Sequence, residues 1–180
     1  MIGLPRFPHE RLGQQHDRAS FRCTREPALE KYLTESGRAA RENAKSISAV
    51  FVLLDSENER RIAGYFTLSN TALIPSTVPV SIAKKLPRYD SWGALKLGRM
   101  ARHDDYAEMG IGPILIARAF QTALTIEKQT GSFALVVDAK NSALASWYAS
   151  LGFISLIDSP LRLFIPNHLM AGYLRRLEIQ

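Results

Sequence analysis

The sequence LGRMARHDDYAEMGIGPILIARAF, residues 97–120, decides the fold. It predicts a strand over 94–102, a turn that contains Gly110 and Gly112, and a helix over 111–129. At such a turn several backbone N–H groups point to one place, and the helix dipole adds partial positive charge there, which suits a pyrophosphate. Glycine is favoured because a Cβ would block the close approach or the required φ.

This spacing excludes two common phosphate-binding loops. A nucleoside-triphosphate loop needs Gly-Lys followed by Ser or Thr, and no such sequence follows Gly112. A dinucleotide-binding turn needs three glycines early in the chain, and these are also missing. The glycine turn therefore indicates either another kind of pyrophosphate site or tight turn chemistry alone.

Outward from this stretch, helix and strand patterns follow one another. Residues 1–25 are polar and irregular, and one amphipathic helix is predicted over 27–45. Its buried face would consist of Leu29, Tyr32, Leu33, Ala40 and Ala44. The remaining predicted elements are strands at 48–55 and 62–70, a short helix at 82–86, a strand at 133–138, a helix capped by Asn141 or Ser142 and ending at Ser150, strands at 153–156 and 161–165, and a C-terminal helix over 168–179. This order predicts a mixed α/β fold, with a sheet flanked by helices.

Composition predicts one ordinary folded domain over 1–180, with 166–180 as a C-terminal extension. Apolar residues make up 46% and charged residues 22% of the 180 positions, which is typical of globular chains and excludes disorder as the main state. Cys23 is the only cysteine, so no intramolecular disulfide can form, as expected in a reducing compartment. We find neither a signal peptide nor an apolar run of the roughly 18 residues that span a bilayer, and expect a cytoplasmic protein without membrane contact. The net charge of +6 favours anionic partners.

A second group of motifs lies around the glycine turn in a fixed order. The pieces are HDRASFRC (16–23), ALEKYL (28–33), IAGYFTLSN (62–70), KKLPRYD (84–90), LGRMA (97–101), MGIG (109–112), VVDA (136–139), WYASLGF (147–153) and SPLRLFIP (159–166). Through them the chain resembles, over residues 12–166, the GNAT acetyltransferases, and more narrowly the GNAT toxins of bacterial toxin–antitoxin pairs. The resemblance implies a twisted mixed sheet of six or seven strands, flanked by about four helices. Two central strands of this sheet, at 94–102 and 133–138, would diverge from one another.

The resemblance also implies acetyl-CoA as co-substrate, with no metal. The pantetheine arm would pair with free main-chain groups of Leu97 to Ala101, and the family's glycine loop aligns with Ala107 to Gly112. The cofactor contacts carried over are Leu97, Arg99, Met100, Ala101, Glu108, Met109, Gly110, Ile111, Gly112 and Asn141.

This loop departs from the family pattern in its charges. Ala107 replaces the usual Gln or Arg, and Glu108 stands where these toxins often have Gly. Asp104 and Asp105 precede the loop where basic residues are common. Three carboxylates near a pyrophosphate predict weaker CoA binding than in a typical relative, unless they point to solvent.

Tyr148 aligns with the family's general-acid tyrosine, beside the CoA sulfur. The alternative is a helix tyrosine that packs its ring on the sheet, and Trp147 beside it is expected in the core. We find no obvious base, since His103 is a candidate by position only. The remaining histidines, His9, His16 and His168, lack metal-ligand spacing. A missing base favours an α-amine, with a pKa near 7.8, over lysine, with a pKa near 10.4.

The GNAT toxins acetylate the α-amine of aminoacyl-tRNA, and the resemblance implies that substrate here. The basic residues that would contact the RNA are Lys84, Lys85, Arg88, Lys96 and Arg99. A solvated basic surface is the alternative. A second basic face, formed by Lys31, Arg38, Arg41 and Lys45, is diluted by Glu35 and Glu42.

The expected partners are a small ribbon-helix-helix antitoxin and a second copy of the chain in a homodimer. Two other functions stay open at this point. One is acetylation of a small amine or a protein, and the other is a non-catalytic GNAT-like binding protein.

Overall fold

A computed structural model describes residues 6–35 and 37–179. The chain forms two compact units: unit 1 comprises Met1–Ser69 and Gly98–Ala119, and unit 2 comprises Asn70–Leu97 and Phe120–Gln180. Strands β3 and β4 and helix α4 contribute residues to both units.

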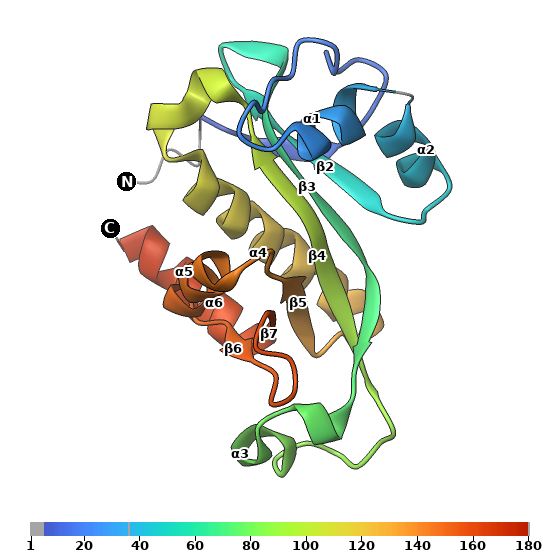
Figure 1. Ribbon diagram of the computed structural model, residues 1–180, viewed down its shortest axis with the longest axis vertical. Helices are drawn as coiled ribbons and strands as arrows, with labels where there is room; N and C mark the ends of the chain where they lie inside the picture. The colour runs from blue at the N-terminus through green and yellow to red at the C-terminus, as the bar shows by residue number, and fades with distance from the viewer. Residues whose placement is uncertain (1–5, 36, 180) are drawn as a thin grey trace. The chain divides into compact units, whose positions relative to one another are not determined.

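The elements alternate much as the sequence predicts. In chain order they are β1 (His9–Arg11), α1 (Pro27–Thr34), α2 (Arg38–Ala44), β2 (Ala49–Asp55), β3 (Asn58–Leu73), the 3-10 helix η1 (Pro75–Thr77), α3 (Val80–Ala83), β4 (Trp92–Arg102), the 3-10 helix η2 (Asp104–Met109), α4 (Ile111–Thr130), β5 (Ala134–Asp138), α5 (Ser142–Ser150), β6 (Ile154–Ser155), β7 (Arg162–Pro166) and α6 (Asn167–Ile179) (Figure 1). The strands form one sheet in the order β1-β2-β3-β4-β5-β7-β6. The pair β4–β5 is parallel, whereas β1–β2, β2–β3, β5–β7 and β6–β7 are antiparallel. The predicted mixed α/β sheet is confirmed.

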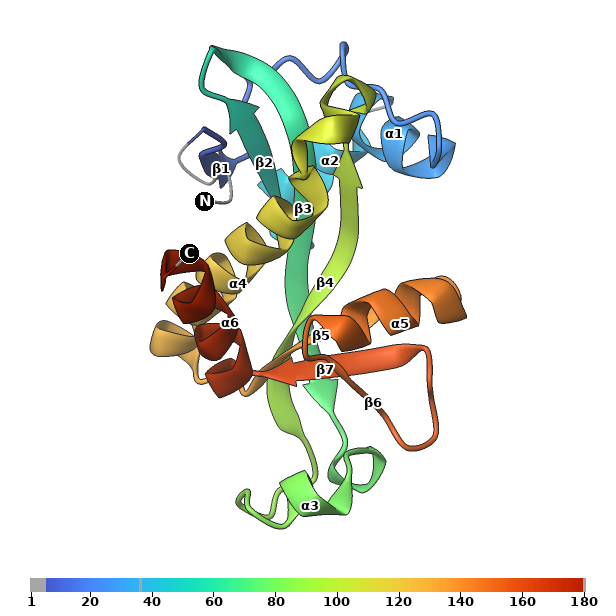
Figure 2. The ribbon, with the colours of Figure 1, turned by 90° about the vertical axis from the view of Figure 1, so that its left-hand side faces the viewer.

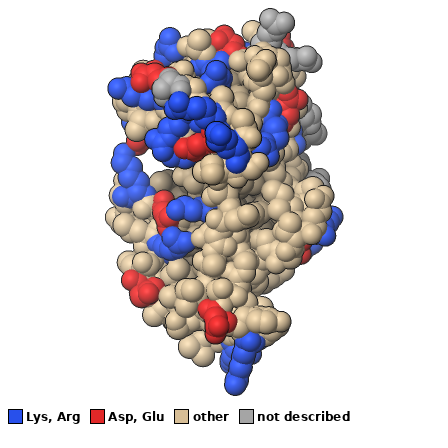
Figure 3. All heavy atoms as spheres, turned by 90° about the vertical axis from the view of Figure 1, so that its right-hand side faces the viewer, with Lys and Arg blue, Asp and Glu red and all other residues tan. Residues whose placement is uncertain are grey.

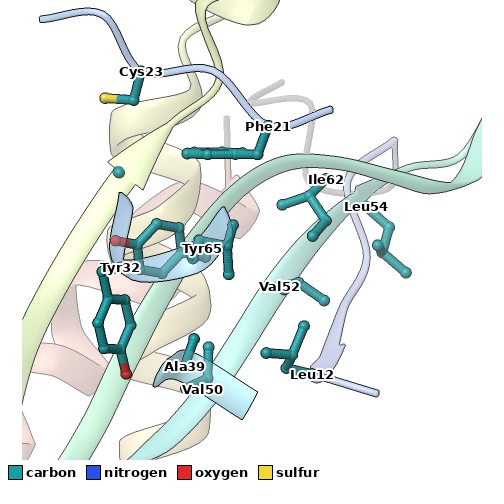
Figure 4. Close-up of a cluster of buried hydrophobic side chains, with 12 residues drawn as sticks. Leu12, Phe21, Cys23, Tyr32, Ala39, Val50, Val52, Leu54, Ile62 and Tyr65 are labelled. Carbon is teal, nitrogen blue, oxygen red and sulfur yellow. The ribbon is translucent and has the colours of Figure 1, made fainter. Parts of the chain in front are cut away.

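The core of unit 1 follows from the alternation of side chains along β2. Val50, Val52 and Leu54 point to one face of the sheet, as expected for every second residue of a strand. Leu33 of α1 and Ala39 of α2 are fully buried in the same cluster, so both helices cover that face. Figure 4 shows Ala39 and Val50 next to one another within this cluster.

The prediction of one helix over 27–45 is wrong, because the chain breaks between α1 and α2. Glu35 is extended (φ −90°, ψ 154°), and Gly37 adopts a left-handed conformation (φ 61°) that favours glycine. The break rotates the second half of the segment about its axis. Ala39 is therefore buried, and Ala44, which was predicted in the buried face, is exposed.

Other differences concern short elements. Strand β1, with the sequence HER, carries no apolar alternation, and only its pairing with β2 defines it. Helix α3 begins at Val80, two residues before the predicted start at 82. Pro79 directly precedes it, and the fixed φ of proline favours the start of a helix there. The turn before Gly110 contains the 3-10 helix η2, which depends on side-chain contacts described below.

Unit 2 is built around β5, whose residues are buried except the last. It pairs with β7 from Ala134 to Asp138, and helices α5 and α6 pack on β7 (Figure 2). Met170 of α6 is fully buried, and the ring of Tyr173 lies 5.4 Å from that of Phe120. The C-terminal segment therefore packs on its own unit. In the part of the chain that is described, no helix has the length and apolarity to cross a membrane.

Candidate functional site

The glycine turn adopts the conformation that its sequence favours. Gly110 has φ 64° and ψ 30°, the left-handed region in which a Cβ is disfavoured, and it ends η2. Helix α4 begins directly after it, so that Gly112 lies in the first turn, where main-chain N–H groups lack helical partners. Met109 and Glu108 are exposed beside this turn. The arrangement is suited to an anion at the start of α4.

Gly64 of β3 allows the base of this turn to pack closely. A Cβ at Gly64 would lie 3.0 Å from the carbonyl oxygen of Ala101 and 3.1 Å from Leu115 Cδ1. It would also lie 3.3 Å from Ile111 Cγ2. The strand that leads into the turn and the helix that leaves it therefore both approach β3 where a side chain is absent.

Two of the three carboxylates near the turn have partners within the protein. Asp104 accepts a hydrogen bond from the main-chain N–H of Thr24 (3.0 Å), which lowers the pKa of its carboxyl group. Asp105 forms an ion pair with Arg61. Glu108 is exposed. The positive charge of Arg61 therefore offsets the negative charge of Asp105, and the repulsion predicted from the sequence falls on Asp104 and Glu108.

His103 does not have a free ring nitrogen for a base. Its Nδ1 accepts a hydrogen bond from the main-chain N–H of Asp105 (3.1 Å), and its Nε2 lies 3.0 Å from the carbonyl oxygen of Ser20, to which it donates. The imidazole is 2% exposed. Its role is to cap η2 and to fix the turn, which the sequence alone did not indicate.

Strand β4 directs alternate main-chain groups to opposite edges. The N–H of Arg99 donates to Thr67 Oγ1 (2.9 Å) and that of His103 to Ala63 O (2.8 Å), so both point toward β3. By strand alternation, the main-chain groups of Gly98 and Met100 point away from β3. Within the stretch Leu97 to Ala101 that was predicted to pair with pantetheine, Gly98 and Met100 thus have the suitable orientation.

A pocket of about 280 Å³ lies at this end of β4 within unit 1. Met100, Ala101 and Arg102 contribute to its lining, together with Cys23 and Arg25. Nη1 of Arg102 is buried and has no hydrogen-bond partner among the described residues. A buried guanidinium N–H without an acceptor is costly.

Tyr148 lies on α5 of unit 2, and its ring packs on Phe153 with 5.2 Å between the centroids. The residue is 6% exposed, and burial raises the pKa of its phenol to about 12. Asn141 is the N-cap of α5, since its side chain accepts the N–H of Leu144 (2.9 Å). Trp147 is partly exposed, so the prediction that it lies in the core is wrong.

The predicted RNA-binding residues do not share one environment. Lys84, Lys85 and Arg88 are exposed in unit 2. Lys96 forms an ion pair with Asp138 (2.6 Å). Arg99 lies in unit 1, where its Nη1 is 3.5 Å from Glu42 Oε2. In the part of the chain that is described, no group of three or more His, Cys, Asp or Glu side chains could hold a metal ion.

Comparisons with known proteins point in one direction, although no family model matches the chain. The probable toxin TacT of Sinorhizobium fredii (strain NBRC 101917 / NGR234) is 21% identical over 159 residues, which cover 84% of this chain and 86% of the relative. The structure of AtaT complexed with acetyl-methionyl-tRNAfMet has a TM-score of 0.81 at 28% identity and covers 92% of this chain and 98% of that one.

A second AtaT structure, of a mutant toxin bound to the C-terminus of the antitoxin AtaR and acetyl-CoA, has a TM-score of 0.73 at 25% identity. It covers 97% of this chain and 99% of that one. In structure, and more distantly in sequence, the chain is thus similar to the GNAT toxins of toxin–antitoxin systems.

Proposed function

We propose that the chain is an acetyl-CoA-dependent N-acetyltransferase that acetylates the α-amino group of aminoacyl-tRNA and so blocks translation. The observation that carries this proposal is the pocket at the end of β4, lined by Met100 and Ala101 and followed by the glycine turn. The similarity to AtaT, whose structures contain acetyl-methionyl-tRNAfMet and acetyl-CoA, supports it.

In this proposal, acetyl-CoA binds along β4 and ends at the start of α4. The main-chain groups of Gly98 and Met100 face the edge where the pantetheine arm would pair. The N–H groups around Gly110 and Gly112 would hold the diphosphate. Arg102, which contributes to the lining of the same pocket, would supply the positive charge that Ala107 cannot.

Tyr148 would donate a hydrogen bond to the leaving sulfur. With a pKa of about 12, its phenol stays protonated at neutral pH and can act as a donor. Complete transfer of this proton to a thiolate of pKa 8.5 would cost about 5 kcal/mol. We therefore assign Tyr148 to a hydrogen bond that strengthens as the C–S bond breaks and the amide C–N bond forms. The proton lost by the attacking amine finally balances the charge on the released thiolate.

The occupied ring nitrogens of His103 support an acceptor that needs no strong base. An α-amine with a pKa near 7.8 is partly neutral at physiological pH, whereas a lysine amine is almost fully charged. The main task of the enzyme is then to position the amine against the thioester.

The direct experiment incubates the protein with radiolabelled acetyl-CoA and aminoacyl-tRNA. We expect label on the aminoacyl group, and at least a 10²-fold lower kcat in Tyr148→Phe with an unchanged Kd for acetyl-CoA. Label only on polyamines or on protein would support an acetyltransferase of a small amine or a protein. Absence of both label and CoA binding would support a non-catalytic binding protein.

The partners follow from the same proposal. AtaT has been captured with its antitoxin AtaR, and we propose that a short ribbon-helix-helix antitoxin binds and silences this chain. We also propose a homodimer. Sedimentation of the protein alone tests the dimer, and coexpression with the product of a neighbouring short gene tests the antitoxin.

A further inference from the structure

A second pocket in unit 1, of about 420 Å³, lies between α1, the start of α2 and β4. We call it the α1–α2 pocket. The side chains that matter for its chemistry are Lys31, Tyr32, Glu35, Arg38 and Arg99. Two of them, Lys31 and Arg38, belong to the second basic face of the sequence analysis, in which Glu35 and Glu42 are interspersed.

Arg99 occupies a defined position in this pocket. Its guanidinium carbon lies 4.0 Å from the centre of the Tyr32 ring, within the range of a strong cation–π contact. The Tyr32 ring also stacks on Tyr65, with 5.9 Å between the centroids. Because Tyr65 is fully buried, the ring that supports Arg99 is fixed by the core. Figure 4 shows Tyr32 and Tyr65 side by side.

Glu42 is the counter-ion of the pocket. Its carboxylate accepts hydrogen bonds from Arg38 Nε (3.0 Å) and from the hydroxyl of Tyr32 (2.9 Å). It also lies 3.5 Å from Arg99 Nη1. Burial by itself would raise the pKa of Glu42, but the hydrogen bonds from Arg38 and Tyr32 lower it below its usual value. The carboxylate is therefore ionised at neutral pH.

The charges around the pocket leave an excess of one positive charge. Lys31, Arg38 and Arg99 contribute three, and Glu35 and Glu42 remove two. The fixed fork of a guanidinium fits the paired oxygens of a phosphate as well as those of a carboxylate. Figure 3 shows Lys and Arg gathered at the upper end of the molecule, over the region where Figure 1 draws α1 and α2.

The pocket is large enough for more than an isolated phosphate, since its volume lies in the range of sites for nucleotide-sized ligands. It also adjoins the proposed acetyl-CoA strand, because Arg99 stands between Gly98 and Met100. We propose that the α1–α2 pocket binds a phosphodiester of the RNA acceptor next to its amine-bearing end, through Arg38 and Arg99, and that this phosphate displaces Glu42 from both. This inference rests on the proposed aminoacyl-tRNA substrate.

The test measures the affinity of uncharged tRNA, which cannot be acetylated, as a function of salt concentration. We expect Arg38→Ala to weaken binding about three- to tenfold, and to reduce the log–log salt slope by about 0.7, as for one lost contact with a single-stranded phosphate. The matched control is Arg41→Ala, on the same helix, exposed and outside the pocket. It should leave the slope unchanged.

Glu42→Gln should change the affinity for tRNA in the opposite direction to Arg38→Ala. The amide keeps the shape of the side chain but frees both guanidinium groups, so that we expect tRNA to bind about three- to tenfold more tightly. Equal slopes for Arg38→Ala and Arg41→Ala, or weaker tRNA binding in Glu42→Gln, would overturn the proposal.

Steady-state kinetics separate this inference from the proposed function. If the pocket binds RNA, Arg38→Ala raises the KM for aminoacyl-tRNA and leaves the KM for acetyl-CoA unchanged. If the wild-type protein labels aminoacyl-tRNA but Arg38→Ala keeps its KM, the pocket assignment fails and the function stands. If the wild type neither binds tRNA nor labels it, both fail.

Discussion

The guanidinium of Arg99 lies 4.0 Å from the centre of the Tyr32 ring, and this contact joins β4 to the first helix of the chain. Tyr32 is 4% exposed, and its hydroxyl donates to Glu42 at 2.9 Å. One aromatic ring thus orients a cation through its face and a carboxylate through its hydroxyl group. The position of Arg99 depends on both interactions.

Replacing Tyr32 separates these two roles. Tyr32→Phe keeps the ring and removes only the hydrogen bond to Glu42, so that we expect the free energy of unfolding to fall by about 1 kcal/mol. Tyr32→Leu also removes the face beneath Arg99 and the stack on Tyr65, and should cost about 2–4 kcal/mol. Urea denaturation of both variants measures the difference. Equal losses would show that the ring contributes nothing beyond its hydroxyl group.

Gly64→Ala tests the close packing beneath the glycine turn. The new Cβ would meet Ala101 O at 3.0 Å and Leu115 Cδ1 at 3.1 Å, so that we expect a loss of about 1–3 kcal/mol of stability and weaker acetyl-CoA binding. Gly93→Ala is the matched control in β4, because a Cβ there meets nothing within 4 Å. Calorimetric titration with acetyl-CoA and urea denaturation check both effects. A Gly64→Ala protein as stable as the control would contradict the packing argument.

The glycine turn and the buried strand β5 could be predicted because their signals are local. Gly110 adopts the left-handed conformation that glycine favours, and FALVVD is a continuous apolar run that fits a strand buried on both faces. The same holds for Asn141, because asparagine is favoured at the N-cap of a helix and Asn141 is the N-cap of α5.

The α1–α2 pocket could not be predicted, because its parts meet only in the fold. The helical spacing of residues 27–45 suggested one straight helix and outweighed the turn signal of the dipeptide Ser36-Gly37. Once the chain turns at Gly37, Arg38 faces the same pocket as Arg99. Likewise, the ring nitrogens of His103 are occupied by main-chain groups that no sequence pattern indicates.

Alkaline pH should destabilise the protein through its tyrosines. Burial raises the pKa of Tyr32, Tyr106 and Tyr148 to about 12, and also that of Tyr65 and Tyr173 above its usual value. The free energy of unfolding is unaffected below the unfolded pKa near 10. It falls as the pH rises toward 12, because the unfolded state then binds fewer protons than the folded state.

Urea denaturation between pH 8 and pH 11.5, with phenolate absorbance as a second signal, measures this loss. The Tyr148→Phe variant removes one of these buried phenols, so its stability should fall less steeply with pH than that of the wild type. Identical slopes for the two proteins would mean that Tyr148 titrates like an exposed tyrosine.

Glu108 is the exposed carboxylate next to Met109 and Gly110 at the turn, whereas Asp105 is paired with Arg61 and Asp104 accepts the main-chain N–H of Thr24. Glu108→Gly and Glu108→Gln should both lower the Kd for acetyl-CoA, by about two- to fivefold, because an exposed charge near an anion contributes on the order of 0.5–1 kcal/mol. The gain should shrink at high salt, which screens exposed charges. Agreement between the two variants assigns the effect to charge, because glutamine keeps the side-chain length that glycine removes. A Kd equal to that of the wild type in both would show that Glu108 points away from the anion.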